Sequence, residues 1–302
     1  MKLGFLSAIL PDCHLSQVID FAAESGLDCV ELACWPKGNA TRRYSGVTHI
    51  DMETLDDAGA EVIKEYAREK HVQISSIGYY PNPLHEDKAQ RETAIRHLKA
   101  CVIGAERLGV NILNTFIGRN RMETPEKNLE LFMEVWPPLI EFAQRHGVRI
   151  AIENCPMYFW TEWPNGDNLA STPDFWRTMF DRIPSDHFGL NYDPSHLVWR
   201  QMDLLKPIHA FSEKLFHFHI KDAVFYKDKY DEMGPFAPPL SYHEPKLPGL
   251  GGIDWGSVIA ALRDIGYAGP LILEIEDRAF EATLEDRMNA IRLSADYIRQ
   301  LL

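Results

Sequence analysis

The stretch LFHFHIKDA (215–223) places two histidines and a lysine at alternate positions. Successive side chains of a β-strand point to opposite faces, so Phe216 and Phe218 would share one face, and the histidines and Lys221 the other. Imidazoles transfer protons or bind metals, and an amine can stabilise a developing negative charge. We therefore interpret the polar face of this strand as part of a chemical site.

Three carboxylates end neighbouring apolar runs in the same way. Glu153 lies in VRIAIEN, Asp193 ends HFGLNYD, and Glu274 lies in PLILEIED. Together with His219 they would present four ligands at one rim if the four strands are neighbours in a barrel. Buried carboxylates this close together cannot all stay charged without a cation. Three oxygen donors and one nitrogen suit a divalent metal ion: Mn²⁺, Mg²⁺, Co²⁺ or Zn²⁺.

Each of these residues also has a simpler interpretation when it is taken alone. Asp193 precedes Pro194, so it could cap a helix that begins with proline. Glu153 and Glu274 could be solvated strand ends, and His219 could be a hydrogen-bonded core histidine. Their joint occurrence on four successive strands favours the metal site.

Other side chains near these positions have weaker roles. We interpret His217, one pleat deeper than His219, as a support for that ligand. Lys221, one pleat nearer the rim, could bond a substrate oxygen or stabilise an enolate, or be a solvated lysine. Trp160 could stack on a sugar face or pack within its loop. Lys37, Arg42 and Arg43 could bind a phosphate or lie in a solvated lid.

The elements that would position these residues are eight apolar runs separated by helical patterns. The runs lie at 2–10, 28–35, 72–80, 110–118, 148–154, 187–193, 214–222 and 270–277. Helical spacing fills the intervals at 16–26, 52–71, 88–109, 125–147, 172–183, 255–267 and 283–302, with a weaker segment near 203–213. This alternation predicts an α/β fold, a (β/α)₈ barrel, in a single domain over 1–302. An open doubly wound sheet is less consistent, because no Gly-x-Gly-x-x-Gly follows the first run.

Three long connections follow runs at the end where a barrel keeps its active site. They span 36–51, 155–168 and 223–252. Long loops in this position act as lids or as walls of the substrate pocket.

Composition limits the partners. The 302-residue chain has a formal net charge of −13, which disfavours nucleic acid as a partner. It has five cysteines, an odd number, and none forms a Cys-x-x-Cys pair, as expected in a reducing compartment. We interpret 2–10 as a strand rather than a signal peptide, see no run long enough to span a membrane, and expect a cytoplasmic protein. A homo-oligomer is left open.

The motifs IEN, NYDPSHL, HFHIKDA, GLGGIDW and GYAGPLILEIE resemble those of the xylose isomerase-like TIM barrels. This group includes sugar phosphate isomerases and epimerases, D-tagatose 3-epimerase, inosose isomerases and dehydratases, and endonuclease IV. The resemblance implies a metal held by Glu153, Asp193, His219 and Glu274. It also implies that the two glutamates are the catalytic acid and base, and that His196 contacts the substrate.

The chain departs from the ketohexose epimerases at two positions that grip sugar hydroxyls in that subgroup. Phe159 stands where they have a second Glu, and Phe225 where they have an Arg. Lys221 instead resembles the inosose and sugar-phosphate members. We therefore expect a metal-dependent isomerase or epimerase of a keto-sugar, sugar phosphate or inosose, working through an enediolate.

The alternatives belong to three other classes. One is a dehydratase that uses the same metal site on an inosose or a 3-dehydroshikimate-like substrate. Another is an endonuclease IV-like repair enzyme, which would need further histidines on early strands. The last is a binding protein without turnover.

Overall fold

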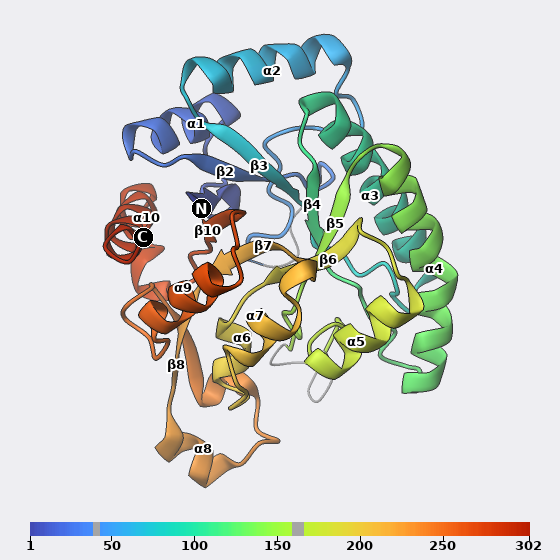
Figure 1. The fold of residues 1–302 in the computed structure, drawn as a ribbon, viewed down its shortest axis with the longest axis vertical. Coiled ribbons are helices and arrows are strands. Elements are labelled where there is room, and N and C mark those ends of the chain that lie inside the picture. Colours follow the sequence, from blue (N-terminus) through green and yellow to red (C-terminus); the bar gives the residue numbers. More distant parts are fainter. Residues whose placement is uncertain (39–42, 159–165) are drawn as a thin grey trace.

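Eight parallel strands close into a barrel in the computed structural model, which describes residues 1–38, 43–158 and 166–302. The order around the barrel is β1–β10–β7–β6–β5–β4–β3–β2, and β1 pairs with both β10 and β2 (Figure 1). The strands are β1 (Lys2–Leu6), β2 (Cys29–Ala33), β3 (Gln73–Gly78), β4 (Ile112–Thr115), β5 (Arg149–Glu153), β6 (Phe188–Tyr192), β7 (Leu215–Ile220) and β10 (Pro270–Leu273). The predicted (β/α)₈ barrel is confirmed.

Helices surround the barrel on its outside (Figure 1). The longer ones are α1 (Leu15–Glu24), α2 (Asp57–Glu69), α3 (Lys88–Leu108), α4 (Pro125–Arg145), α5 (Pro173–Arg182), α9 (Trp255–Asp264) and α10 (Leu284–Arg299). Between β6 and β7 the chain forms only α6 (Ser195–Val198), α7 (Lys206–Ala210) and the 3₁₀ turn η3 (Ser212–Lys214). The weak helical pattern near 203–213 matches α7 and η3.

The first predicted run is shorter than expected. Residues 2–10 were expected to form one strand, but β1 ends at Leu6 and Ser7–Ile9 form a 3₁₀ turn, η1. The hydroxyl of Ser7 accepts a hydrogen bond from the backbone N–H of Ala33. At this point a hydrogen bond from β2 to a side chain takes the place of a backbone hydrogen bond between the two strands.

The two faces of β7 have different surroundings. Phe218 is buried on the outer face against Tyr192 and Tyr267, whereas His217 and His219 point into the barrel. The expected grouping of Phe216 with Phe218 is wrong. The β6–β7 register shifts between Leu190 and Asn191, and the ring of Phe216 joins a separate cluster with Ile112 and Ala151. An irregularity of this kind changes the face to which a side chain points.

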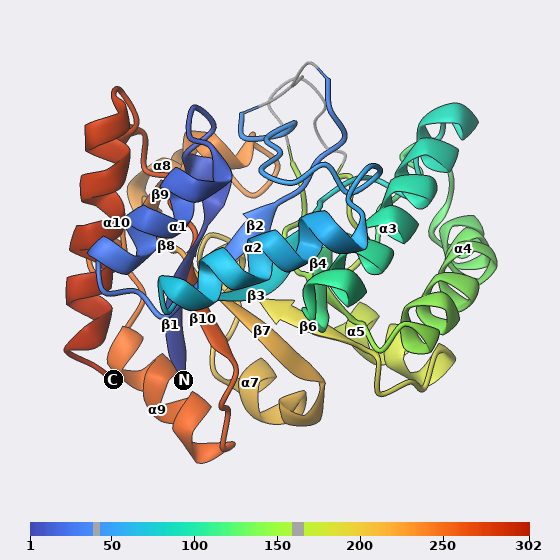
Figure 2. The same cartoon turned by 90° about the horizontal axis from the view of Figure 1, so that it is seen from above.

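The long connection after β7 is a structured flap rather than a plain loop. It contains a two-stranded antiparallel sheet of β8 (Asp222–Phe225) and β9 (His243–Lys246), with α8 (Lys227–Met233) and the 3₁₀ turn η4 (Pro239–Ser241) between them. The α8 end of this flap extends away from the barrel (Figure 1). Both chain termini lie at one end of the barrel, and the β2–α2 connection lies at the other (Figure 2).

None of the helices in the described ranges combines the length and the apolar character needed to cross a membrane.

Candidate metal centre

The structure brings the four residues proposed as metal ligands together. Ligand atoms of Glu153, Asp193, His219 and Glu274 all lie within 4.8 Å of one another. Glu153 is the last residue of β5 and His219 lies in β7. Asp193 and Glu274 directly follow β6 and β10, one residue beyond the strand ends. Four successive strands therefore deliver four ligand side chains to one point, as the sequence predicted.

Two ligand atoms of this cluster are buried and lack a hydrogen-bond partner among the described residues: Oδ2 of Asp193 and Nδ1 of His219. Oδ1 of Asp193 accepts a 2.8 Å hydrogen bond from the Ser195 backbone N–H, but α6 begins at Ser195 with Pro194 as its N-cap, so the expected helix cap by Asp193 is not found. Nδ1 of His219 lies 3.0 Å from Oε2 of Glu274. Both atoms have charged neighbours at about 3 Å but no well-directed hydrogen bond within the described ranges, and a divalent cation accepts both an oxygen and an imidazole nitrogen as ligands. The residues fit a metal ion.

Two cationic side chains border the same cluster. Lys221 Nζ donates to Oε2 of Glu274 at 2.9 Å and lies 3.0 Å from Oδ2 of Asp193. Its side chain is only 4% exposed, so the interpretation as a solvated lysine is wrong. His196 Nε2 lies 3.1 Å from Oδ2 of Asp193 and 3.3 Å from Oε1 of Glu153. Two of the three residues that were proposed to contact substrate therefore lie beside the proposed ligands.

These contacts change the proton affinities of the two glutamates in opposite directions. Burial alone would raise the pKa of Glu153, but hydrogen bonds to His196 and His219 lower it to about 2. Burial raises the pKa of Glu274, although Lys221 opposes that shift. Burial would lower the pKa of Lys221, but Asp193 and Glu274 hold it well above its usual value. The neighbouring cationic groups therefore outweigh the burial of Glu153 but not that of Glu274.

His217 supports the site through the polar interior of the barrel. Its Nδ1 lies 2.9 Å from Oδ1 of Asn191, and its Nε2 lies 3.0 Å from Oγ of Ser76. Asn191 Nδ2 in turn lies 3.1 Å from Nε2 of His219. All of these side chains are fully buried. The polar side chains of β7 therefore form hydrogen bonds with side chains of other strands rather than with solvent.

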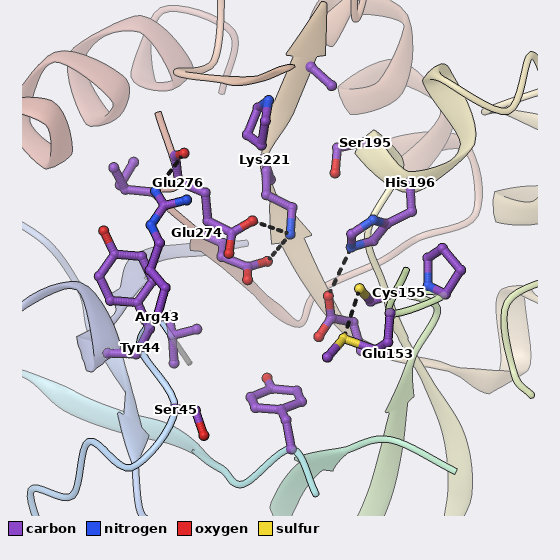
Figure 3. Close-up of a pocket in the computed structure, with 18 of the residues that line it drawn as sticks. Arg43, Tyr44, Ser45, Glu153, Cys155, Ser195, His196, Lys221, Glu274 and Glu276 are labelled. Carbon is purple, nitrogen blue, oxygen red and sulfur yellow. Dashed lines mark hydrogen bonds and ion pairs between the residues drawn. The ribbon is translucent and has the colours of Figure 1, made fainter. Parts of the chain in front are cut away.

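A cavity of about 370 Å³ opens above the ligands. Figure 3 shows Glu274 and Glu276 on one side of it, Glu153 and His196 on the other, and Lys221 between them. The walls are largely aromatic or apolar: Leu6, Trp35, Tyr80, Phe116, Met157, Tyr158, Trp199 and Leu240. This size suits a small molecule. Trp160, proposed to stack on a sugar, lies outside the described residues.

Several residues of the cavity were not singled out by sequence reasoning. His243 of the flap stacks on Trp199, with ring centroids 4.9 Å apart and an interplanar angle of 14°. Its Nδ1 donates to the Pro239 carbonyl at 2.7 Å. Tyr80 lies beneath the cavity, and its hydroxyl donates to Glu31. The sequence indicated only that these residues belong to segments expected to line the site. It gave no reason to choose them over their neighbours in the same segments.

Two of the three basic residues considered for phosphate binding have other partners, and the third, Arg42, lies outside the described residues. Lys37 Nζ lies 2.9 Å from Oδ2 of Asp51, and its side chain is 70% exposed. Arg43 forms an ion pair with Glu281 and donates to the Glu276 carbonyl at 2.8 Å. Arg43 therefore links the chain before α2 to the segment after β10, where both line the cavity.

Comparisons with known proteins agree with the barrel fold. The family model for xylose isomerase-like TIM barrels matches residues 19–301. An inosose isomerase of Bacillus velezensis is 21% identical, over 99% of this chain and 97% of its own. An inosose dehydratase of Geobacillus thermodenitrificans is 28% identical over 60% of each chain. Among solved structures, the IOLI protein with a bound zinc atom superposes with a TM-score of 0.73 at 19% identity, over 100% of this chain and 99% of that one.

Proposed function

Because the chain belongs to the xylose isomerase-like TIM barrel family, we propose that it is a divalent-metal-dependent isomerase or epimerase of a keto-sugar, sugar phosphate or inosose. The observation that carries this proposal is the convergence of the side chains of Glu153, Asp193, His219 and Glu274, with ligand atoms within 4.8 Å of one another, beside a cavity of small-molecule size. The inosose isomerase and dehydratase relatives support a sugar or inosose substrate.

Each residue has a defined task in this proposal. Glu153, Asp193, His219 and Glu274 would hold the metal. The ion would polarise the substrate carbonyl and acidify the neighbouring C–H. Glu153 and Glu274 lie on opposite sides of the cavity; one of them would accept that proton at a carboxylate oxygen, and the other, or the same one, would return a proton. Lys221 Nζ would stabilise the negative charge that develops on the substrate oxygen.

The surroundings serve the same chemistry by excluding water and orienting the substrate. The aromatic wall and the flap enclose the carboxylates, which strengthens charge interactions among them. His196 borders both Glu153 and Asp193 and would donate to a substrate hydroxyl. The Arg43 contacts to Glu276 and Glu281 would hold this wall of the cavity in place during turnover.

A dehydratase is the second candidate, because the inosose dehydratase has the higher identity of the two relatives described above. It would use the same base and expel a β-hydroxyl as water. Mass analysis separates the two reactions after incubation of the Mn²⁺-loaded protein with a panel of inososes and ketoses. An isomerase leaves the product mass unchanged, and a dehydratase lowers it by one water. A panel with neither product would contradict both.

A further inference from the structure

Glu31 of β2 is a fully buried carboxylate to which the proposed reaction assigns no step. Its Oε2 lies 2.9 Å from Nε2 of His219 and 3.5 Å from Nε2 of His217. Its Oε1 accepts a hydrogen bond from the hydroxyl of Tyr80. Both oxygens therefore have partners inside the barrel, and the shorter contact to an imidazole is made to a proposed metal ligand.

The contact with His219 determines which ring nitrogen is free to bind a metal. An ionised carboxylate only accepts hydrogen bonds, and a neutral imidazole carries one N–H. Nε2 of His219 also lies 3.1 Å from the amide nitrogen of Asn191, but the shorter contact is to the charged carboxylate of Glu31, which favours the tautomer in which Nε2–H donates to Glu31 and the lone pair lies on Nδ1. Nδ1 is the nitrogen that lies 3.0 Å from Glu274 Oε2 and lacks a hydrogen-bond partner within the described ranges.

We infer that Glu31 is a positioning residue, which fixes the tautomer and the ring orientation of His219 so that Nδ1 faces the metal. This inference rests on the metal site proposed above. A carboxylate behind a histidine ligand raises the basicity of the ligand and restricts its rotation. Glu31 would act on the metal only through His219, since its own oxygens bond Tyr80 and the imidazole.

The neighbouring strand leaves room for this carboxylate. Gly78 ends β3, and a Cβ built there would lie 2.5 Å from Oε1 of Glu31 and 3.1 Å from the ring of Tyr80. Any larger residue at this position would displace the carboxylate. The absence of a side chain at position 78 therefore leaves the space that the Glu31 carboxylate occupies. This observation supports a fixed position for the carboxylate independently of its hydrogen bonds.

The direct test is metal affinity, measured by competition with a chromogenic chelator for Zn²⁺ or Mn²⁺. Glu31→Gln retains the size and one acceptor but removes the charge, and we expect binding to weaken about 10–100-fold. Gly78→Ala changes no titratable group and should weaken binding in the same direction by moving the carboxylate. Asp28→Asn is the matched control: it makes the same acid-to-amide change just before β2, where Asp28 accepts from the Leu3 N–H. It should bind like wild type.

A spectroscopic readout separates positioning from a general loss of structure. In the Zn²⁺-loaded protein, the Nε2–H of His219 should give a slowly exchanging downfield proton resonance. In Glu31→Gln this resonance should shift upfield and exchange faster, while the resonances of residues outside the barrel interior stay in place. An unchanged resonance would contradict the role of Glu31.

The outcomes distinguish this inference from the proposed function. Wild type that binds metal, with Glu31→Gln and Gly78→Ala binding equally well, would overturn the role of Glu31 and leave the metal site standing. Wild type that binds no divalent ion would overturn the metal site and this inference with it. Should Glu31→Gln fail to fold, the affinity and the His219 resonance of Gly78→Ala decide the question.

Discussion

Nζ of Lys221 lies 2.9 Å from Oε2 of Glu274, and the two side chains are only 4% and 14% exposed. The same ammonium lies 3.0 Å from Oδ2 of Asp193 and 3.3 Å from Oε2 of Glu276. One buried cation therefore balances three carboxylates, two of which are proposed metal ligands. The barrel can hold this acidic cluster only because the lysine and the histidines supply compensating charge.

Lys221→Met keeps the length of the side chain but removes its charge, and should destabilise the protein. Removing one partner of a buried ion pair costs about 3–5 kcal/mol. Denaturant unfolding in the presence of chelator measures this loss. Lys37→Met, which breaks an exposed pair with Asp51, is the control and should change stability by about 1 kcal/mol or less. Equal effects of the two substitutions would contradict the role of Lys221.

Removal of the metal should lower the melting temperature, because it leaves the carboxylates of the site without their strongest counter-charge. At a metal concentration about 100-fold above Kd, bound metal would contribute about 2.7 kcal/mol. Melts with Mn²⁺ and with chelator measure the difference. His219→Ala should melt at the same temperature in both. A wild-type melt that is insensitive to chelator would mean that no ion stabilises the site.

The free energy of unfolding should depend on pH through His243, the buried histidine of the flap. Burial lowers the pKa of His243 to about 4, against about 6.5 in an unfolded chain. Between these values the unfolded chain binds a proton that the folded protein does not. The contribution of His243 to the free energy of unfolding is therefore complete above pH 6.5. It decreases by about 1.4 kcal/mol per pH unit as the pH falls towards 4.

His243→Asn should flatten this part of the profile, since it keeps a donor for the Pro239 carbonyl and removes the titrating ring. Unfolding free energies at pH 4.5, 5.5 and 6.5 measure the slope. His209→Asn, at an exposed position in α7, is the control. A wild-type slope retained in full by His243→Asn would assign the effect to other groups.

The acid and base are tested by Glu153→Gln and Glu274→Gln. Glutamine keeps an oxygen donor for the metal but cannot act as a base near neutral pH, so each change should lower kcat by about 10²–10⁴-fold. Glu244→Gln, on the outer part of the flap beside Lys246, should leave kcat near the wild-type value. A Glu274→Gln enzyme that binds metal normally and turns over within a few-fold of wild type would remove Glu274 from the mechanism.

The sequence predicted the barrel and the four-ligand cluster because both follow from local patterns. Apolar runs alternate with helical spacing, and Glu153, Asp193 and Glu274 stand at or directly after strand ends, where a barrel brings side chains together. The irregularity that moves Phe216 away from Phe218 has no such signal, since it depends on how β6 and β7 pair. The alternating pattern alone could not reveal it.

Glu31 was missed for a similar reason. It stands within the apolar run CVELA of β2, where a lone carboxylate gives no indication of its partner. Its proposed role depends on its contact with His219, which is 188 positions away in the sequence and meets Glu31 only inside the closed barrel. His243 depends in the same way on the flap, whose pairing Phe225↔His243 was not predicted. Contacts between distant segments inside a closed sheet require the tertiary structure.

The most direct test of metal-dependent proton transfer is the incorporation of deuterium from D₂O. The Mn²⁺-loaded protein is incubated with inososes and ketoses, the metal is removed, and the products are examined by NMR. We predict that one of these compounds is converted to an isomer of unchanged composition that carries deuterium on the carbon next to the carbonyl, and that chelator abolishes the conversion. An isomer that forms equally well with chelator, or a panel in which no compound isomerises or exchanges hydrogen, would contradict the account.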